Sequence, residues 1–160
     1  MGFALSDLTV SSTAFGPRES IPARHTGEGE DVSPALSWSQ PPEGAKAWAV
    51  ICHDPDAPLV SANGSYGFVH WVLYNLPAAT TSLVEGDKQG TSGVNDFGNT
   101  GYGGPMPPPG HGPHQYYFWV LALDQALDLP AGLSLQELLQ RIEPNVIGMN
   151  RLVGTYQRDA

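Results

Sequence analysis

The sequence predicts a mainly β fold, a two-sheet antiparallel β sandwich with short helices near the C-terminus. The evidence is three runs, residues 46–53, 69–76 and 115–124, which are rich in Val, Trp, Tyr and Ile and apolar on both alternating faces. Strands of this kind belong in a sheet that is covered on both sides. Long loops rich in glycine and proline separate the runs. Weaker strand candidates are residues 7–14, 35–39 and 152–157.

The clearest helix covers residues 134–143. Its apolar residues recur at the i, i+3, i+4, i+7 spacing, which gives one face that can pack on a sheet. Ser134 and Glu137 form a capping-box pattern at its start, and Pro144 ends it. A second short helix is predicted over residues 145–150.

Length and charge restrict the class of protein. A chain of 160 residues suits a single domain, residues 1–160, with one core. Seven basic and 16 acidic residues give a formal charge of −9. Without a cluster of Lys or Arg, binding to nucleic acid or to an anionic membrane is not expected.

Two further features bear on the compartment. No stretch reaches the ~18 apolar residues of a transmembrane segment, and the N-terminus has no basic stretch followed by a long apolar run. A cytoplasmic protein is therefore predicted. Cys52 is the single cysteine and lies in an apolar run, so we expect a buried, inert thiol.

Polar residues gather at the ends of the predicted central strands. Asp54 and Asp56 follow the first strand, His70 begins the second, and His114 precedes the third. If the first strand is antiparallel to the other two, these four side chains meet at one rim of the sheet. Each also has a structural interpretation: an aspartate before proline often begins a turn, and a histidine at a strand end often caps the fold.

The loop over residues 101–113 is rich in glycine and proline. Its prolines stiffen it, and Gly103, Gly104 and Gly110 allow positive φ and close backbone approach. We expect the N–H groups of these glycines to be exposed and able to hold a small anion without any lysine.

Four motifs carry a resemblance to a known family: DPDAP (54–58), HWVLYNLP (70–77), GYGGPMPPPGHGPHQYYFWVLALD (101–124) and LVGTYQR (152–158). Together they resemble the phosphatidylethanolamine-binding protein family, in particular its bacterial Raf-kinase-inhibitor-like branch. The resemblance implies a Greek-key β sandwich with a small pocket at one end. It also implies that the pocket accepts phosphate-like groups, including phosphoethanolamine head groups.

Carried over motif by motif, the resemblance implies ligand-binding residues and no catalytic residue, cofactor or metal ligand. It further implies a cis X-Pro bond near the site. Gln115 departs from the family pattern, which usually has arginine here, and its lack of charge should weaken the positive potential at the pocket rim. The implied ligand-binding residues are Asp54, Asp56, Pro58, His70, Trp71, Gly104, Pro105, His114 and Tyr116.

The preferred function is binding of a small phosphorylated ligand or anion, as an inhibitor or regulator of a partner protein such as a kinase or protease. An alternative is a small-molecule enzyme, an isomerase, cyclase or lyase, in which Asp54 works with His70 or His114 as an acid–base pair. Two histidines and one aspartate also match a metal-binding triad in type. A homodimer is compatible with the apolar, proline-rich loops.

Overall fold

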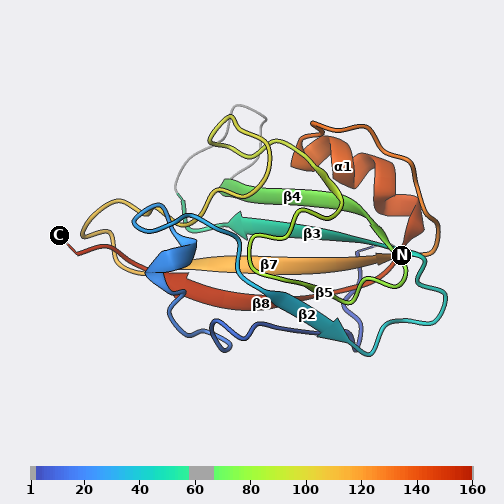
Figure 1. Ribbon diagram of the computed structural model, residues 1–160, viewed down its shortest axis with the longest axis horizontal. Coiled ribbons are helices and arrows are strands. Elements are labelled where there is room, and N and C mark those ends of the chain that lie inside the picture. The colour runs from blue at the N-terminus through green and yellow to red at the C-terminus, as the bar shows by residue number, and fades with distance from the viewer. Residues whose placement is uncertain (1–2, 58–66, 160) are drawn as a thin grey trace.

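Two antiparallel sheets pack face to face in the computed structural model, which describes residues 3–57 and 67–159 (Figure 1). The five-stranded sheet has the order β6-β4-β3-β7-β8 and the three-stranded sheet the order β1-β2-β5. The elements are β1 (Thr9–Ser11), η1 (Ala23–His25), β2 (Leu36–Ser39), β3 (Ala47–Asp54), β4 (Phe68–Pro77), β5 (Ser82–Leu83), β6 (Thr91–Ser92), β7 (His114–Leu123), α1 (Leu135–Ile142), η2 (Glu143–Asn145) and β8 (Val146–Tyr156).

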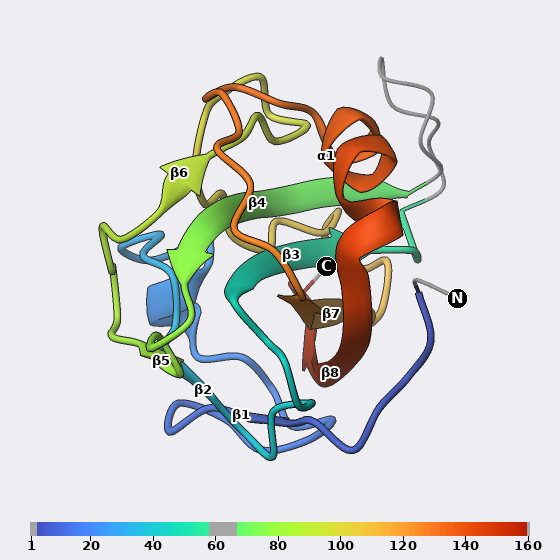
Figure 2. The same ribbon diagram turned by 90° about the vertical axis from the view of Figure 1, so that its right-hand side faces the viewer.

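The larger sheet is covered on both faces, as the apolar strands predict. Figure 2 shows α1 on one side of this sheet and β1 and β2 on the other. Along β7, Phe118 and Val120 enter the core shared with the smaller sheet, whereas Leu121 and Leu123 enter the core beneath the helix. This division explains why the three central strands have no polar face.

The predicted strands are confirmed, and so is their relative direction. The three apolar runs form β3, β4 and β7, and the weaker candidates fall in β1, β2 and β8. β3 pairs antiparallel with both β4 and β7. The C-terminal end of β3 therefore meets the N-terminal ends of its two neighbours at one rim of the sheet.

The helix is confirmed with its predicted capping box. The Ser134 side chain accepts a hydrogen bond from the Glu137 backbone N–H at 3.1 Å, and the Glu137 carboxylate accepts one from the Ser134 N–H at 3.0 Å. The second helix, predicted over residues 145–150, is wrong. Asn145 ends the short helix η2, and residues 146–150 begin β8, where Met149 and Asn150 pair with β7, because pairing with a distant strand outweighs local preference.

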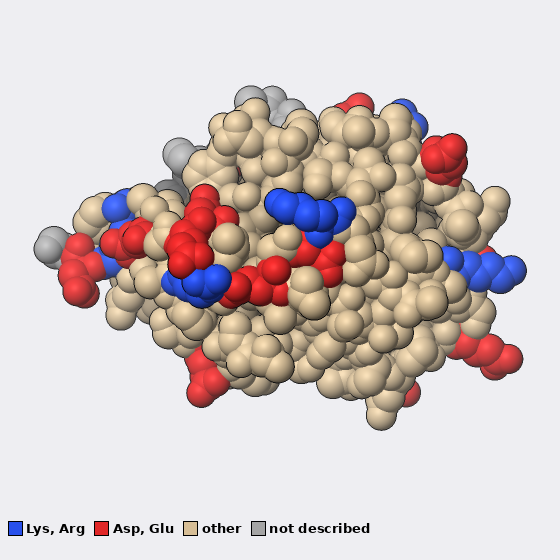
Figure 3. All heavy atoms as spheres, in the orientation of Figure 1, with Lys and Arg blue, Asp and Glu red and all other residues tan. Residues whose placement is uncertain are grey.

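The buried thiol and the sparse charge are also features of the fold. Cys52 is fully buried, and burial raises the pKa of its thiol well above the usual value. In Figure 3 the Lys and Arg side chains on this face are scattered among acidic ones and form no basic patch. Within residues 3–57 and 67–159, no helix is long and apolar enough to cross a membrane.

Removing the helix cap provides a test of the fold. We expect Ser134→Ala to lower the free energy of unfolding by about 1 kcal/mol, because the backbone N–H of Glu137 loses its hydrogen-bond acceptor. Chemical denaturation at neutral pH measures this loss. The exposed Ser39 in β2 provides the control Ser39→Ala, which we expect to change stability by less than about 0.5 kcal/mol; equal effects of the two variants would contradict a role for the cap.

Candidate ligand-binding site

A small pocket of about 180 Å³ lies at the rim where β3, β4 and β7 meet. Four of the predicted residues line it: Asp54, His70, His114 and Tyr116. The remaining lining is mostly apolar and comprises Ala57, Phe68, Phe97, Met106, Pro107 and Pro108. The strand ends thus bring a few polar groups together in an apolar setting, which is the usual composition of a small-molecule site.

A β-bulge in β4 directs His70 towards this pocket. Cys52 pairs with Trp71 and the next residue, His53, pairs with Val69, so His70 is the extra residue of the ladder. His70 and Trp71 consequently both lie on the face towards the smaller sheet. The His70 ring contacts Tyr116 edge-to-face, with 5.2 Å between ring centroids. Trp71 packs in the core instead and does not line the pocket.

His70 is a neutral hydrogen-bond acceptor towards a ligand. Its Nδ1 lies 2.7 Å from the carbonyl oxygen of Gly103. Because a carbonyl can only accept, Nδ1 carries the proton and Nε2 is left as the acceptor. Burial lowers the pKa of His70 to about 4, against the opposing effect of the hydrogen bond to Gly103. The ring is therefore uncharged at neutral pH.

His114 stands between a buried carboxylate and a second imidazole. Its Nδ1 lies 2.6 Å from Oδ2 of Asp54, and both residues are buried. Oδ1 of Asp54 accepts the backbone N–H of Asp56 at 2.8 Å. On the other side, Nε2 of His114 lies 2.6 Å from Nδ1 of His111, which is exposed. With Nδ1 protonated towards Asp54, a neutral His114 accepts from His111, and a protonated one donates to it.

Tyr116 provides a hydroxyl group that stays protonated. The residue is fully buried, and burial together with the nearby Asp54 raises the pKa of the phenol. The hydroxyl therefore remains an O–H donor across the physiological pH range.

The loop between β6 and β7 forms one wall of the pocket through Met106, Pro107 and Pro108. Arg158 holds this wall, since its Nε donates to the Pro107 carbonyl at 2.6 Å. The backbone N–H of Gly110 donates in turn to the Arg158 carbonyl at 3.0 Å. The C-terminal segment thus ties down a loop that its prolines already stiffen.

The expectation that the loop glycines offer free N–H groups to an anion is wrong. The N–H of Gly103 donates to the His70 carbonyl, and that of Gly104 donates to Oδ1 of Asp31 at 2.7 Å. Gly104 instead permits close packing, because a Cβ there would lie 2.2 Å from the His25 carbonyl oxygen. Neither Gly104 nor Pro105 lines the pocket. No cis X-Pro bond occurs within the described ranges, and the bond between Ala57 and Pro58 lies outside them.

The other predicted residues have different positions. Asp56 is exposed and accepts the backbone N–H of Gln115 at 2.7 Å, so it anchors the start of β7. Pro58 lies outside the described residues. Although Gln115 carries no charge, a guanidinium still lies beside it, because Arg18 donates to its side-chain oxygen at 3.1 Å.

His111 was not among the predicted site residues, although its Nδ1 contacts Nε2 of His114. A usable signal was the HGPH spacing, which places two imidazoles three residues apart in a tight loop. Phe68 and Phe97 were also missed, because aromatic residues in a loop or at a strand start resemble ordinary core residues. Among the described residues, no group of three or more His, Cys, Asp or Glu side chains has an arrangement that could hold a metal ion.

Comparisons with known proteins show the family of the chain. The phosphatidylethanolamine-binding protein family model matches residues 11–157. A UPF0098 protein of Aquifex aeolicus is 40% identical over 162 residues, which span 95% of this chain and 90% of the relative. The solved structure of CT736, a phosphatidylethanolamine-binding protein homolog of Chlamydia trachomatis, is 35% identical with a TM-score of 0.86, covering 95% of this chain and 98% of its own. Escherichia coli YbcL is 33% identical with a TM-score of 0.85, covering 95% and 99%.

The titration of His70 tests the electrostatics of the pocket. An unfolded histidine titrates near pH 6.5, so between about pH 4 and 6.5 the unfolded chain binds the proton more readily. The contribution of the neutral His70 ring to the free energy of unfolding is fully present above pH 6.5 and is lost as the pH falls. By about pH 4 the loss amounts to about 3 kcal/mol. We expect NMR of the imidazole to show a neutral ring down to about pH 4.

The variant His70→Asn separates this effect from other acid titrations. Asparagine retains an N–H donor for the Gly103 carbonyl but does not titrate in this range. Its free energy of unfolding should therefore fall by about 3 kcal/mol less than that of the native chain between pH 6.5 and 4. Parallel pH profiles for the two proteins would contradict the neutral, buried imidazole.

Proposed function

The chain belongs to the phosphatidylethanolamine-binding protein family, and we propose that its rim pocket binds the phosphate-like head group of a small ligand. Ligand binding or regulation is the type of function that membership of this family supports. The observation that carries the finer proposal is the set of polar groups in an apolar pocket: the Tyr116 O–H donor, the His70 Nε2 acceptor and the His114 ring held by Asp54.

The charges around the pocket favour a singly charged head group. No Lys or Arg is among the described residues that line the pocket, and the carboxylate of Asp54 lies behind His114. A phosphate dianion would meet a carboxylate and neutral acceptors, which is unfavourable. A monoanion can donate its own O–H to Nε2 of His70 and accept from Tyr116. Binding of a head group that is a dianion in solution therefore requires the ligand to take up a proton.

The size of the pocket also limits the ligand. A volume of about 180 Å³ corresponds to about six water molecules at about 30 Å³ each. That is enough for a phosphate and a short substituent. A longer substituent would leave the pocket across Phe97 and Met106, which are exposed large apolar side chains at its rim.

His111 occupies the position that a ligand of His114 would need. Nε2 of His114 is already hydrogen-bonded to His111. A head group that binds at this nitrogen must replace that bond, so the exposed imidazole competes with the ligand. We propose in addition that the protein is cytoplasmic, from its sequence pattern, and that it regulates a kinase or a protease, from its family resemblance.

A second candidate is an acid–base enzyme, and the Asp54–His114 pair favours it. A carboxylate that holds an imidazole by Nδ1 is the usual way to orient a general base. The Tyr116 O–H would donate a hydrogen bond to negative charge that develops on the substrate. Release of inorganic phosphate or ethanolamine from a phosphoethanolamine probe would favour this candidate over simple binding.

The pH dependence of phosphoethanolamine binding tests the proposal. For a phosphate monoester with a second pKa of about 6, the monoanion rises from about one in a hundred molecules at pH 8 to about half at pH 6. We expect the affinity to rise about fiftyfold over this range, measured by NMR at the His114 side chain at fixed ionic strength. An affinity that is flat or rises with pH would show that the dianion binds and would refute this form of the proposal.

Two variants locate the binding at this pocket. Tyr116→Phe removes only the donor hydroxyl and should weaken binding about tenfold. His114→Gln should abolish saturable binding, since the ring that contacts the ligand is gone. If both variants bind as the native chain does, the ligand binds elsewhere.

Competition by His111 has its own test. His111→Ala should strengthen phosphoethanolamine binding about fivefold at pH 7, because a net hydrogen bond of about 1 kcal/mol no longer has to be broken. Calorimetry on both proteins measures the ratio. Weaker binding by the variant would show instead that His111 is itself a ligand group.

A further inference from the structure

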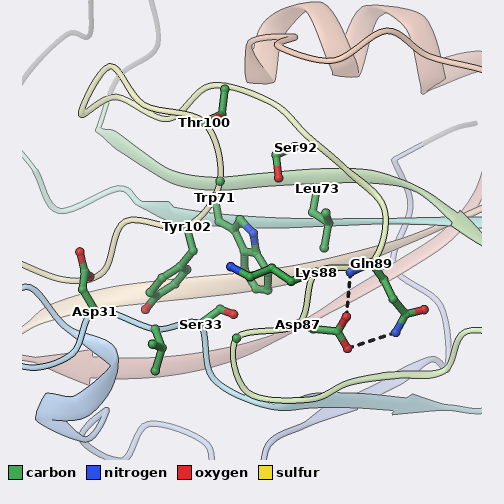
Figure 4. A pocket seen from close by; sticks show the side chains of 13 residues that line it. Asp31, Ser33, Trp71, Leu73, Asp87, Lys88, Gln89, Ser92, Thr100 and Tyr102 are labelled. Carbon is green, nitrogen blue, oxygen red and sulfur yellow. Dashed lines mark hydrogen bonds between the residues drawn. The ribbon is translucent and has the colours of Figure 1, made fainter.

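A second cavity, of about 310 Å³, is lined by Trp71, the residue next to His70 in the bulge of β4 (Figure 4). No residue lines both this cavity and the rim pocket. Its walls come from segments far apart in the chain, including residues 31–33, 86–89 and 100–102, with Trp71 between them. The volume reaches the lower end of the range of small-molecule sites, about 300–1,000 Å³.

Hydrogen bonds fix the walls in advance of any ligand. The Asp87 carboxylate accepts the backbone N–H groups of Val84 at 2.9 Å and Gln89 at 2.8 Å. Burial opposes ionisation of Asp87, but these hydrogen bonds outweigh it and lower the pKa of the carboxyl group. Opposite, the Tyr102 hydroxyl donates to the His25 carbonyl at 2.6 Å. A site built in this way loses little entropy when a ligand binds.

Several polar groups of the lining have no protein partner within the described ranges. Trp71 is 3% exposed and Ser33 is 6% exposed, yet neither the indole N–H nor the hydroxyl makes a hydrogen bond to another described residue. The hydroxyls of Ser92 and Thr100 are also unpaired within this part of the chain. Among the described residues, Trp38 Nε1 is the single buried side-chain polar atom without a hydrogen-bond partner, so the unpaired groups of the cavity are open to solvent. A ligand that enters the cavity can therefore form hydrogen bonds with them in place of water.

Lys88 contributes a cation that forms none of the ion pairs found among the described residues. Figure 4 shows its side chain extending over Trp71 towards Tyr102. One ammonium and the two carboxylates of Asp31 and Asp87 give the lining a formal charge of −1. An anion is therefore not the natural ligand of this cavity.

We propose that this cavity is a second binding site, for a neutral polyhydroxylated molecule of the size of one hexose. Each ligand hydroxyl can donate to a carboxylate or a serine and accept from Lys88 or the Trp71 indole, so one ligand can use every unpaired group. The volume equals that of about ten water molecules at about 30 Å³ each, which suits a single sugar ring.

The experiment follows the assigned indole N–H of Trp71 in ¹H–¹⁵N spectra during titration with glucose, galactose and mannose. Glycerol at the same mass concentration controls for bulk effects. We expect a saturable shift with at least one hexose and none with glycerol. Absence of a saturable shift with all three hexoses would overturn the proposal.

A matched pair of variants locates the binding, because the chain has only two lysines, Lys46 and Lys88. Both are exposed, and only Lys88 lines the cavity. Lys88→Met should raise the Kd for the hexose about tenfold, since a charged donor is lost, whereas Lys46→Met should leave it unchanged. Equal effects of the two variants would overturn the proposal.

Phosphate separates this site from the rim pocket. Inorganic phosphate should shift the His114 side chain, and hexose should still shift Trp71 when phosphate is saturating. A Trp71 indole that responds to phosphate in His114→Gln but not to hexose would show an anion site in the second cavity and overturn the proposal. Failure of phosphate to shift His114 would count against the rim pocket alone.

Discussion

The pairing of β3 with both β4 and β7 is the constraint on which the rest of the structure depends. Because both faces of the large sheet are covered, its three central strands carry their polar groups near their ends. The two antiparallel ladders bring three such ends to one rim. Asp54 and His114 therefore meet as a buried pair, although 59 residues separate them in the chain.

The same pair determines the charge of the site. A buried carboxylate is costly unless it is hydrogen-bonded, and Asp54 has the His114 ring and the Asp56 N–H as partners. Nothing in the lining adds a cation, and burial keeps His70 neutral. An acidic chain can still bind an acidic head group in such a place if a proton is bound along with it. The proton then has the role that arginine or lysine has in most phosphate sites.

Local sequence patterns were sufficient to predict the central strands, the helix and four of the residues that line the rim pocket. The apolar runs indicated the central strands, and the polar residues at their ends were expected to meet on the condition that the first strand is antiparallel to the other two. The start of β8 was missed because residues 145–150 contain no strong strand signal and are ordered by pairing with β7. The hydrogen bonds of the loop glycines were missed for a similar reason. Their acceptors, the carboxylate of Asp31 and the carbonyls of His70 and Arg158, are distant in sequence.

The bulge in β4 has a consequence for both cavities. It places His70 and Trp71 side by side on one face, so that the first lines the rim pocket and the second lines the polar cavity. The loop opposite has the same division: Tyr102 lines the polar cavity, and Gly103 accepts from Nδ1 of His70. Trp71 thus contacts Tyr102 at the polar cavity, and their chain neighbours His70 and Gly103 are hydrogen-bonded beside the rim pocket. The two cavities are therefore built on adjacent residues of the same strand and the same loop, although none of the described residues lines both.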